Sequence, residues 1–432
     1  MTRTFSSHHG TRRVGALWLV LYRPRLRRSP LLPIFLIVLV DVLGLTIVIP
    51  LLAIYSERFG ASPFVATLIM SSFAVCQLVS GPILGKLSDR YGRRPILLIS
   101  QLGTLAGFVV MAEAHALWMV FAGRILDGAT AGNLAIAQAY ISDHTVPEKR
   151  AKSFALIGIA FGLGFAIGPV ISGWLSHYSL EAPFWAAAAL SGCSILGTIF
   201  ILPKDAPTAP TLPGAQTVTA GGGRLGILDW GMYAVYFRRP GMGRLLAQFF
   251  VYMFSFSMFI GCFALFAERH YTWNGHPFTP REIGFAFAGS SVVGLVIQGG
   301  LMGRLVARFG EANLSGVGFG TLFVGYFLLG TSDSLYMLGV AIFFSSIGNS
   351  LLRPALTSLV TRLADRTEQG VILGLTQSLS SVAAIIAPPI AGTLIDHDLG
   401  RVWAWTAAAA GLVGLFLVRR KVAAPAPPPA TT

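Results

Sequence analysis

The stretch "GKLSDRYGRRPILLI", residues 85–99, is a short charged segment between long apolar runs. It carries four bases and one acid within nine residues: Lys86, Asp89, Arg90, Arg93 and Arg94. Gly85 and Gly92 allow tight backbone geometry and close helix approach. The apolar runs on either side have the length of a helix that crosses a bilayer, about 20 residues. The segment is therefore expected to be a turn that connects two membrane-spanning helices.

Outward from this segment, the whole chain has the composition of a membrane protein. Of its 432 residues, 54% are hydrophobic and 12% are charged, and that charged fraction is about half the fraction in a typical soluble domain. The apolar stretches long enough to span a bilayer are residues 31–54, 65–84, 95–114, 116–140, 153–175, 183–202, 244–267, 282–302, 313–331, 335–358, 371–394 and 402–418. The expected fold class is an all-α integral membrane protein with twelve transmembrane helices.

The net charge of +14 is explained by membrane topology and not by nucleic-acid binding, because no soluble module is present to carry a basic patch. If the N-terminus is cytoplasmic, 26 of the 32 Lys and Arg residues fall on the cytoplasmic side and four fall on the other side. The positive-inside rule then places both termini in the cytoplasm. The three cysteines, Cys76, Cys193 and Cys262, lie in expected spans, so neither a disulfide framework nor a metal site is predicted.

The chain also contains an internal repeat. "GKLSDRYG" (85–92) corresponds to "GRLVARFG" (303–310) at an offset of 218, and "GPVISG" (168–173) corresponds to "APPIAG" (387–392) at 219. Two six-helix pseudo-repeats separated by a linker rich in Pro, Thr, Gly and Ala are therefore predicted. The expected parts are a basic cytoplasmic arm (1–30), an N-terminal six-helix bundle (31–203), a cytoplasmic linker (204–243), a C-terminal six-helix bundle (244–418) and a cytoplasmic tail (419–432). Such halves can alternate access between the two sides; the alternative is that duplication is only an economical way to build a large bundle.

The charged turn carries a family resemblance. Gly85, Leu87, Asp89, Arg90, Gly92, Arg93 and Arg94 fit the pattern G-x-L-x-D-R-x-G-R-R/K, and the chain resembles the major facilitator superfamily, which has this pattern between its second and third helices. The resemblance implies that this turn gates the cytoplasmic side, with Asp89 docking on the second half. The alternative for the bases is a plain topology signal. In the second copy of the motif (303–310), Ala307 occupies the position of the acid. Only the first copy is therefore expected to have a gating acid.

A second pattern bears on the direction of transport. "GLGFAIGPVISG" (162–173) is similar, through Gly164, Gly168, Pro169 and Gly173, to the span-five pattern of proton-coupled drug antiporters. "VDVLGLTIVIPLL" (40–52), "AYISD" (139–143) and "APFWAAAAL" (182–190) resemble the tetracycline/proton antiporter branch. The third and ninth spans lack the acids of the tetracycline exporters. The resemblance therefore implies the antiporter class and a bacterial inner membrane, without tetracycline specificity.

Three ionisable residues inside the expected spans are candidates for proton coupling, because intramembrane charges are costly. Asp41 lies about 15 Å from the inner end of its span, and Arg124 and Asp127 lie about 12 and 16 Å from the outer end of theirs. The three groups are expected to share a level. The alternative for Asp41 is a polar residue that holds a helix break near Gly44 and Pro50. The alternative for Arg124 and Asp127, which are spaced i,i+3, is a self-contained ion pair.

Polar or aromatic side chains in the remaining spans are candidates for a substrate cavity. These are Gln77, Asn133, Gln138, Gln248, Phe259, Gln298, Asn349, Arg353 and Gln377. The alternative for most of them is an interhelical hydrogen bond or packing, and for Arg353 it is a side chain that reaches the headgroups. The sequence does not identify the substrate.

The predicted function is a secondary active transporter: a proton-coupled efflux antiporter of small lipophilic or drug-like molecules that works by alternating access. The alternatives are a proton-coupled uptake symporter of a sugar or other small solute, and a non-transporting receptor or scaffold. Catalytic motifs such as H-E-x-x-H, G-x-S-x-G and the phosphate loop do not occur, so neither an enzyme nor a cofactor is expected. The expected partners are a substrate, protons and membrane lipids, without nucleic acid, and the chain is expected to act as a monomer.

Overall fold

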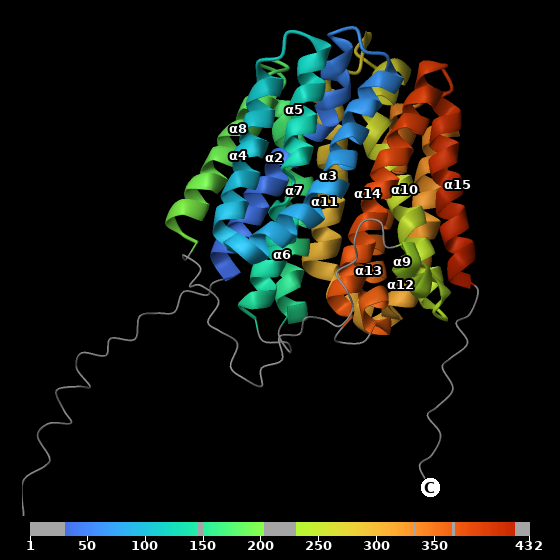
Figure 1. The fold of residues 1–432 in the computed structure, drawn as a ribbon. Helices are drawn as coiled ribbons and strands as arrows, with labels where there is room; N and C mark the ends of the chain where they lie inside the picture. The colour runs from blue at the N-terminus through green and yellow to red at the C-terminus, as the bar shows by residue number, and fades with distance from the viewer. Residues whose placement is uncertain (1–30, 146–149, 203–229, 332, 365–367, 420–432) are drawn as a thin grey trace, which may run out of the picture.

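The computed structural model describes residues 31–145, 150–202, 230–331, 333–364 and 368–419. This part of the chain is almost entirely α-helical, and the helices run side by side in one bundle (Figure 1). The expected arm, most of the expected linker and nearly all of the expected tail lie outside the described residues. The all-α fold class is confirmed.

The first half of the bundle consists of α2 (Leu31–Glu57), α3 (Pro63–Tyr91), α4 (Arg93–Ala112), α5 (Leu117–Ala129), α6 (Asn133–Asp143), α7 (Arg150–Leu175) and α8 (Ala182–Phe200). Local sequence explains where a helix such as α3 begins. The Ser62 hydroxyl accepts a hydrogen bond from the Val65 amide, and Pro63 stands in the first turn, where a missing N–H costs nothing.

The second half begins with a short helix, α9 (Trp230–Arg238), which falls inside the expected linker. It continues with α10 (Met242–His270), β1 (Thr272–Trp273), β2 (His276–Pro277), α11 (Pro280–Val296), the π-helical turn η2 (Ile297–Leu301), α12 (Met302–Thr331), α13 (Leu335–Leu363), α14 (Gln369–Asp396) and α15 (Gly400–Arg419). The two strands form an antiparallel hairpin. Its turn residues Asn274 and Gly275 both have positive φ, as tight hairpin turns require.

Ten segments of the described chain are long and apolar enough to cross a membrane. One of them, Pro280–Thr331, contains 52 residues and makes two crossings, because Gly310 interrupts it with a non-helical backbone. The pair α5 and α6 makes a further crossing. The described residues thus contain the twelve expected crossings. Since the number is even, α2 begins and α15 ends on the same side (Figure 1). We call this the terminal side and the other the opposite side.

The expected fourth span is not one continuous helix. It is divided into α5 and α6 at Thr130–Gly132, where the Thr130 hydroxyl donates to the Leu126 carbonyl. Ser100 of α4 supplies the groups that the break needs: its hydroxyl donates to the Thr130 carbonyl and accepts from the Gly132 amide at 3.0 Å. A break inside a membrane is tolerated where neighbouring side chains bind the freed backbone groups.

Two further expectations about local structure are wrong. The expected break of the first span near Gly44 and Pro50 is absent, because α2 runs unbroken from Leu31 to Glu57 with Pro50 inside it. The motif at 85–92 is not a turn through most of its length either. Residues 85–91 are the last turns of α3, and the chain changes direction only at Gly92.

The repeat is visible in the backbone at this junction. Gly92 has φ 97° and ψ 151°, and Gly310, which lies 218 residues later, has φ 73° and ψ 154°. These positive φ values favour glycine. Each half therefore bends its chain at the same place by the same device.

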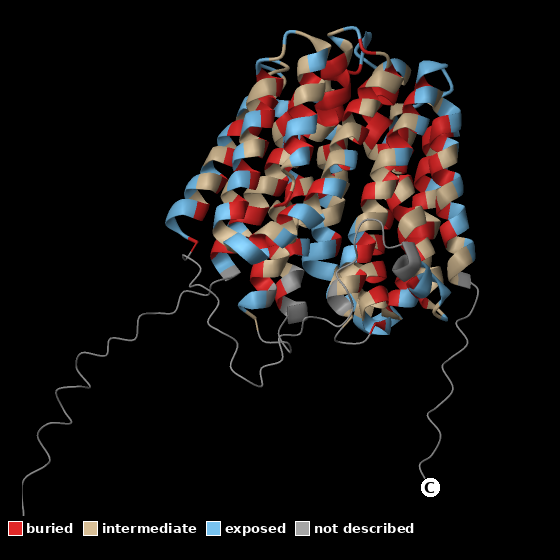
Figure 2. Ribbon diagram, in the orientation of Figure 1, coloured by how far each residue is buried: buried red, intermediate tan, exposed pale blue. Residues whose placement is uncertain are grey.

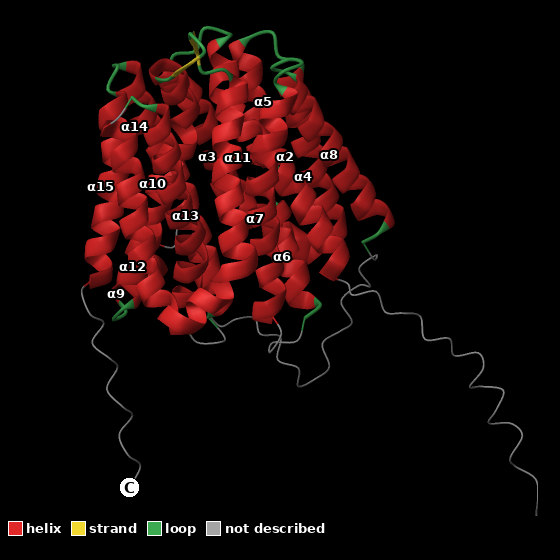
Figure 3. Cartoon of the chain, turned by 180° about the vertical axis from the view of Figure 1, so that it is seen from behind, coloured by secondary structure: helices red, strands yellow, loops and turns green. Residues whose placement is uncertain are grey.

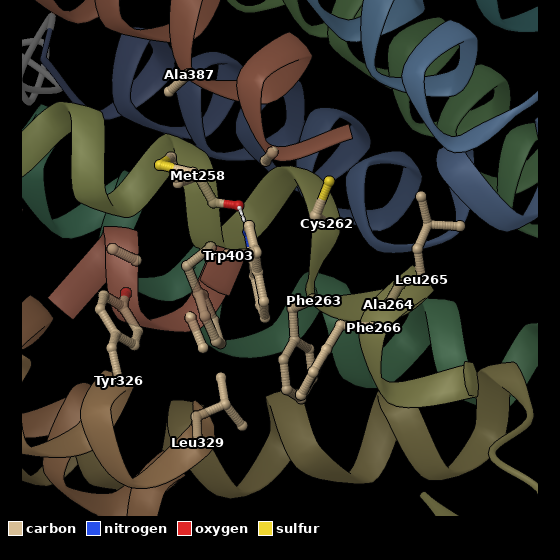
Figure 4. Packing of buried hydrophobic residues seen from close by; sticks show 14 of the residues in the cluster. Met258, Cys262, Phe263, Ala264, Leu265, Phe266, Tyr326, Leu329, Ala387 and Trp403 are labelled. Carbon is tan, nitrogen blue, oxygen red and sulfur yellow. Dashed lines mark hydrogen bonds between the residues drawn. The ribbon is translucent and has the colours of Figure 1, made fainter. Parts of the chain in front are cut away.

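Buried residues run along the interior of the bundle (Figure 2) in several apolar clusters, and the largest of them joins the second half to Ala53 and Ile54 of α2 and Ala66 of α3. In the second half, aromatic side chains of α10, α12 and α15 pack together. The ring centres of Phe259 and Tyr326 lie 5.1 Å apart, and the Trp403 indole donates to the Met258 carbonyl at 3.1 Å (Figure 4). Large apolar residues such as Trp118 and Phe200 are exposed on the outer faces, as expected for surfaces that face lipid.

The two halves meet along two helix pairs, α3 with α14 and α7 with α11 (Figures 1 and 3). On the opposite side these pairs touch closely. A Cβ added to Gly392 of α14 would lie 2.8 Å from the Pro63 carbonyl oxygen and 2.2 Å from the Thr67 hydroxyl, both on α3. Glu57 and Arg269 also form an ion pair between the halves on this side.

The same helix faces are open on the terminal side. Gly374 lies 18 residues before Gly392, and Gly81 and Gly85 lie 18 residues after Pro63 and Thr67. Since 18 residues make about five helical turns, each residue shares a face with its counterpart. A Cβ added to Gly374, Gly81 or Gly85 would meet no atom within 4 Å. The halves are therefore closed on the opposite side and apart on the terminal side.

Candidate functional site

The candidate proton-coupling residues lie in the first half, where α2, α6 and α8 meet. Asp41 of α2 has Asn133 of α6 and Ser194 of α8 as polar neighbours. In the described part of the chain, both carboxylate oxygens of Asp41 are buried without a hydrogen-bond partner, and so is the Asn133 side-chain oxygen. Gln101 donates to the Ser194 hydroxyl at 2.7 Å, which fixes Ser194 in place. Asp41 thus has neighbours but no fixed partner.

Arg124 and Asp127 form a buried ion pair of 3.0 Å on α5, which is the arrangement given above as the alternative to a role in proton coupling. The Arg124 guanidinium also lies 4.1 Å from the centre of the Phe73 ring of α3. Beside this pair, α4 and α5 approach each other so closely that only glycine fits at position 107. A Cβ added to Gly107 would lie 2.7 Å from the Gly123 carbonyl oxygen. The negative charge of Asp127 still acts on Asp41, so the three expected residues belong to one electrostatic group.

The candidate gate residues tie the terminal ends of three helices of the first half together. Arg93, the first residue of α4, forms ion pairs with Asp89 of α3 and with Asp143 of α6, the latter at 2.8 Å. Its guanidinium also donates to the Ser88 hydroxyl at 2.8 Å. Arg90 lies over the ring of its neighbour Tyr91 at 5.3 Å. In this conformation the ion pair of Asp89 is made within its own half.

The corresponding junction of the second half also carries an ion pair, although Ala307 replaces the acid of the motif. Glu311 follows Gly310 and is buried, with 8% of its surface exposed. It binds Arg362 of α13 at 2.7 Å and accepts a hydrogen bond from Ser358 at 3.1 Å. The motif comparison missed this pair because the acid stands on the other side of the glycine.

The glycines of the expected antiporter motif on α7 allow close helix contacts. A Cβ on Gly164 would lie 2.5 Å from Val42, and a Cβ on Gly168 would lie 2.1 Å from the Thr46 hydroxyl, both on α2. That hydroxyl donates to the Gly164 carbonyl at 2.9 Å. Gly173 allows a similar close contact between the two halves, since a Cβ added to it would lie 2.7 Å from the Gly284 Cα of α11. Pro169 lies inside the unbroken helix.

Two of the expected cavity residues lie on one face of α13 in the second half. Asn349 donates to the Tyr326 hydroxyl at 3.4 Å, and its own side-chain oxygen has no hydrogen-bond partner among the described residues. Arg353 does not point to the headgroups. Its guanidinium lies 4.6 Å from the centre of the Phe161 ring of α7, in the other half.

The remaining expected cavity residues are dispersed. Gln77 and Gln138 are half-buried, whereas Gln298 and Gln377 are exposed. Gln248 is buried, and its side-chain oxygen lacks a hydrogen-bond partner among the described residues. Phe259 lies in the aromatic core described above.

Several residues of these sites were not found by reading the sequence. Ser194, Gln101, Tyr252 and Phe161 are of types that occur throughout membrane helices, so their identity alone carries no signal. Spacing could have found Tyr252, which follows Gln248 by four residues and therefore shares its face of α10.

The comparisons with known proteins agree with this architecture. The family model of the Major Facilitator Superfamily matches residues 34–278 and 245–432. The chain belongs to this family, and it is an integral multi-pass membrane transporter.

Its relatives include proteins of antibiotic resistance. The chain is 29% identical to the tetracycline resistance protein of class B from Escherichia coli over 380 residues, which cover 85% of this chain and 90% of that protein. It is 31% identical to the class C protein from Escherichia coli over 393 residues, which cover 88% of this chain and 93% of that protein. Among solved structures, the human organic anion transporter MFSD10 (TETRAN) superposes with a TM-score of 0.67 at 24% identity over 91% of this chain and 99% of that one. This last likeness concerns the fold alone.

Proposed function

We propose that the protein is a proton-coupled efflux antiporter of small lipophilic or drug-like molecules. It works by alternating access between its two six-helix halves, residues 31–203 and 244–418, which the segment 204–243 links. We place it as a monomer among the lipids of a bacterial inner membrane, with both termini and the terminal side in the cytoplasm. The excess of basic residues on that side supports this orientation.

The observation that carries the proposal is the environment of Asp41. Both of its carboxylate oxygens are buried without a hydrogen-bond partner in the described part of the chain. A charged carboxylate is costly in such a place unless a proton, a cation or a hydrogen-bond donor joins it. A proton and a substrate that compete for this one group would move in opposite directions, which is antiport.

The other motif residues support the conformational cycle. Arg124 and Asp127 set the charge around Asp41, and Gly85, Asp89, Arg90, Gly92 and Arg93 form the cytoplasmic gate. Gly164, Gly168, Pro169 and Gly173 hold α7 against α2 and α11, which is the contact that closes the opposite side. In the cycle, Asp89 leaves Arg93 and docks on the second half when the terminal side closes.

The substrate class follows from the relatives only in part. The E. coli proteins named above are tetracycline resistance proteins, and a further relative, 26% identical, is multidrug resistance protein 2 of Bacillus subtilis. Neither α4 nor residues 313–331 of α12 contain an acid. We therefore propose drug-like substrates without assigning tetracycline, and we place them among the polar groups around Gln77, Asn133, Gln138 and Asn349.

The proposal is tested in proteoliposomes with an imposed pH gradient and a panel of lipophilic drugs, sugars and organic anions. The wild type should drive one class of drug uphill against the proton flow, and Asp41→Asn should abolish this uphill transport while downhill exchange persists. Glu113→Gln, which changes an exposed acid on the opposite side, is the control and should transport normally. Uphill transport by Asp41→Asn, or transport in the direction of proton flow, would contradict the proposal.

A further inference from the structure

Arg353 is an intramembrane cation that the proton-coupling group does not use. It lies ten residues from the end of α13 at Leu363, which is about 15 Å of helix and thus inside a hydrocarbon core about 30 Å thick. Among the described residues, Arg124 has Asp127 as its counter-ion, but no carboxylate pairs with Arg353. The Arg353 side chain is half-buried, and an ionisable side chain inside a membrane span marks a functional site.

The surroundings of Arg353 are aromatic and come from both halves. Its guanidinium lies over Phe161 of α7, and Phe161 stacks on Phe165 one turn further along the same helix. Phe165 meets Phe256 of α10 edge to face at 5.7 Å, and Phe256 lies 6.2 Å from Tyr252. Tyr252 in turn interacts electrostatically with Arg353. One ring, Phe161, is therefore in direct contact with the cation, and it begins a series of four aromatic rings that crosses the junction of the two halves.

Polar atoms without partners lie on the helix faces next to this ring set. The side-chain oxygens of Asn349 and Gln248 are buried without a hydrogen-bond partner among the described residues. Asn349 is one turn from Arg353 on α13, and Gln248 is one turn from Tyr252 on α10, so each pair shares a helix face. Buried polar groups are normally satisfied, so each of these two amide oxygens has hydrogen-bonding capacity that no described residue uses.

We propose that Arg353 is the anchor for a substrate that carries a carboxylate on an aromatic body. The guanidinium offers paired N–H donors that match a carboxylate in geometry and charge. Phe161, Phe165 and Phe256 offer ring faces and edges to the aromatic body. The substrate supplies a counter-ion, which none of the described residues provides. The inference rests on the proposed transport function only in calling this ligand the substrate.

Binding to purified protein in detergent tests the inference without protons or transport. The probes are 1-naphthoate and its neutral counterpart 1-naphthamide, measured by isothermal titration calorimetry. Because a hydrogen bond to a charged group contributes about 1.5–3 kcal/mol, wild type should bind the acid about tenfold to hundredfold more tightly than the amide. Arg353→Gln should bind both equally, and Arg353→Lys should retain part of the preference.

Arg304→Gln removes a cation from an exposed position on the terminal side and should keep the preference, which controls for net charge. Arg353→Gln should also melt at a higher temperature than the wild type, because it removes a half-buried charge that no described carboxylate neutralises. If the arginine had only a structural role, the substitution would lower the melting temperature.

Equal affinity of the wild type for acid and amide, or an undiminished preference in Arg353→Gln, would overturn the inference. Loss of the preference on adding phosphatidylglycerol, but not phosphatidylcholine, would assign Arg353 to a lipid headgroup and would also overturn it. None of these results depends on proton coupling, so the inference and the proposed antiport can fail separately.

Discussion

The contact between Gly173 and Gly284 is expected to set which side of the transporter is closed. A Cβ on Gly173 would lie 2.7 Å from the Gly284 Cα, whereas two carbon atoms prefer a separation of about 3.5–4.0 Å. Gly173→Ala must therefore push α7 and α11 apart by about 1 Å. Overpacking of this kind costs about 1–3 kcal/mol, and the cost falls only on the conformation in which these helices touch.

A penalty of that size shifts the ratio between the two conformations by about 5-fold to 150-fold. The shift can be measured as distances between spin labels at exposed sites. Labels at Ser179 and His276, which flank the α7–α11 contact, should move apart in Gly173→Ala. Labels at Tyr91 and Leu363, at the terminal ends of α3 and α13, should move closer together because the terminal side closes as the opposite side opens.

The matched control is Gly289→Ala, on the same helix as Gly284, because a Cβ at Gly289 would meet no atom within 4 Å. It should leave both distances unchanged. If Gly173→Ala folds normally and neither distance changes, the glycine contact does not determine the conformation. If the first distance grows while the second stays constant, the substitution only loosens the bundle, and the reasoning about two alternating closures is refuted.

Two further substitutions test the open face and the segment that precedes the second half. Gly81→Leu should keep the wild-type melting temperature, because Gly81 faces open space in this conformation, but it should abolish transport by blocking closure of the terminal side. The control Gly289→Leu should keep both the melting temperature and transport. Hydrogen bonds from Arg239 hold the pKa of Glu368 below its usual value, so their ion pair stabilises the protein above about pH 4.3 and loses its effect as the pH falls through the lowered pKa. Glu368→Gln should therefore reduce thermal stability by less than about 1 kcal/mol at pH 7, since both side chains are partly exposed, and the difference in melting temperature should vanish in acid.

The membrane spans and the repeat could be predicted because each rests on a physical requirement that many residues share. A span needs about 20 apolar residues whatever their order. The interruptions of helices could not be predicted, because they depend on single contacts across the bundle. The break at Thr130 is stable only because Ser100 of another helix binds it, whereas Pro50 leaves α2 unbroken.

The candidate site likewise has features that could be predicted from the sequence and features that could not. Charged residues in apolar spans are rare, so Asp41, Arg124, Asp127 and Arg353 could be singled out from the sequence. The pairing of Arg124 with Asp127 was open to prediction, because the i,i+3 spacing places the acid one turn away on the same helix. That no described carboxylate pairs with Arg353 was not, because it depends on which helices pack around α13. The series of aromatic rings that begins at Phe161 beside Arg353 comes from α7 and α10, about 90 residues apart in the chain.

The ion pairs at the two junction glycines show what the duplication kept. Arg93 and Glu311 each follow a junction glycine and are 218 residues apart, and their partners Asp143 and Arg362 are 219 residues apart. The two ion pairs thus occupy corresponding positions in the two halves, but the acid and the base have exchanged places. Helix dipoles make the exchange consequential, because the N-terminus of a helix favours anions and its C-terminus favours cations.

In the second half both charges agree with their helix dipoles, since Glu311 begins the part of α12 after Gly310 and Arg362 lies in the last turn of α13. In the first half both charges oppose them, since Arg93 begins α4 and Asp143 ends α6. Each such placement changes the energy by about 0.3–1 kcal/mol. The charges of the first half are therefore the less favourably placed of the two pairs. This half also contains the intact motif, so the junction expected to exchange partners during transport is the one whose charges are stabilised by their side-chain partners and not by their own helices.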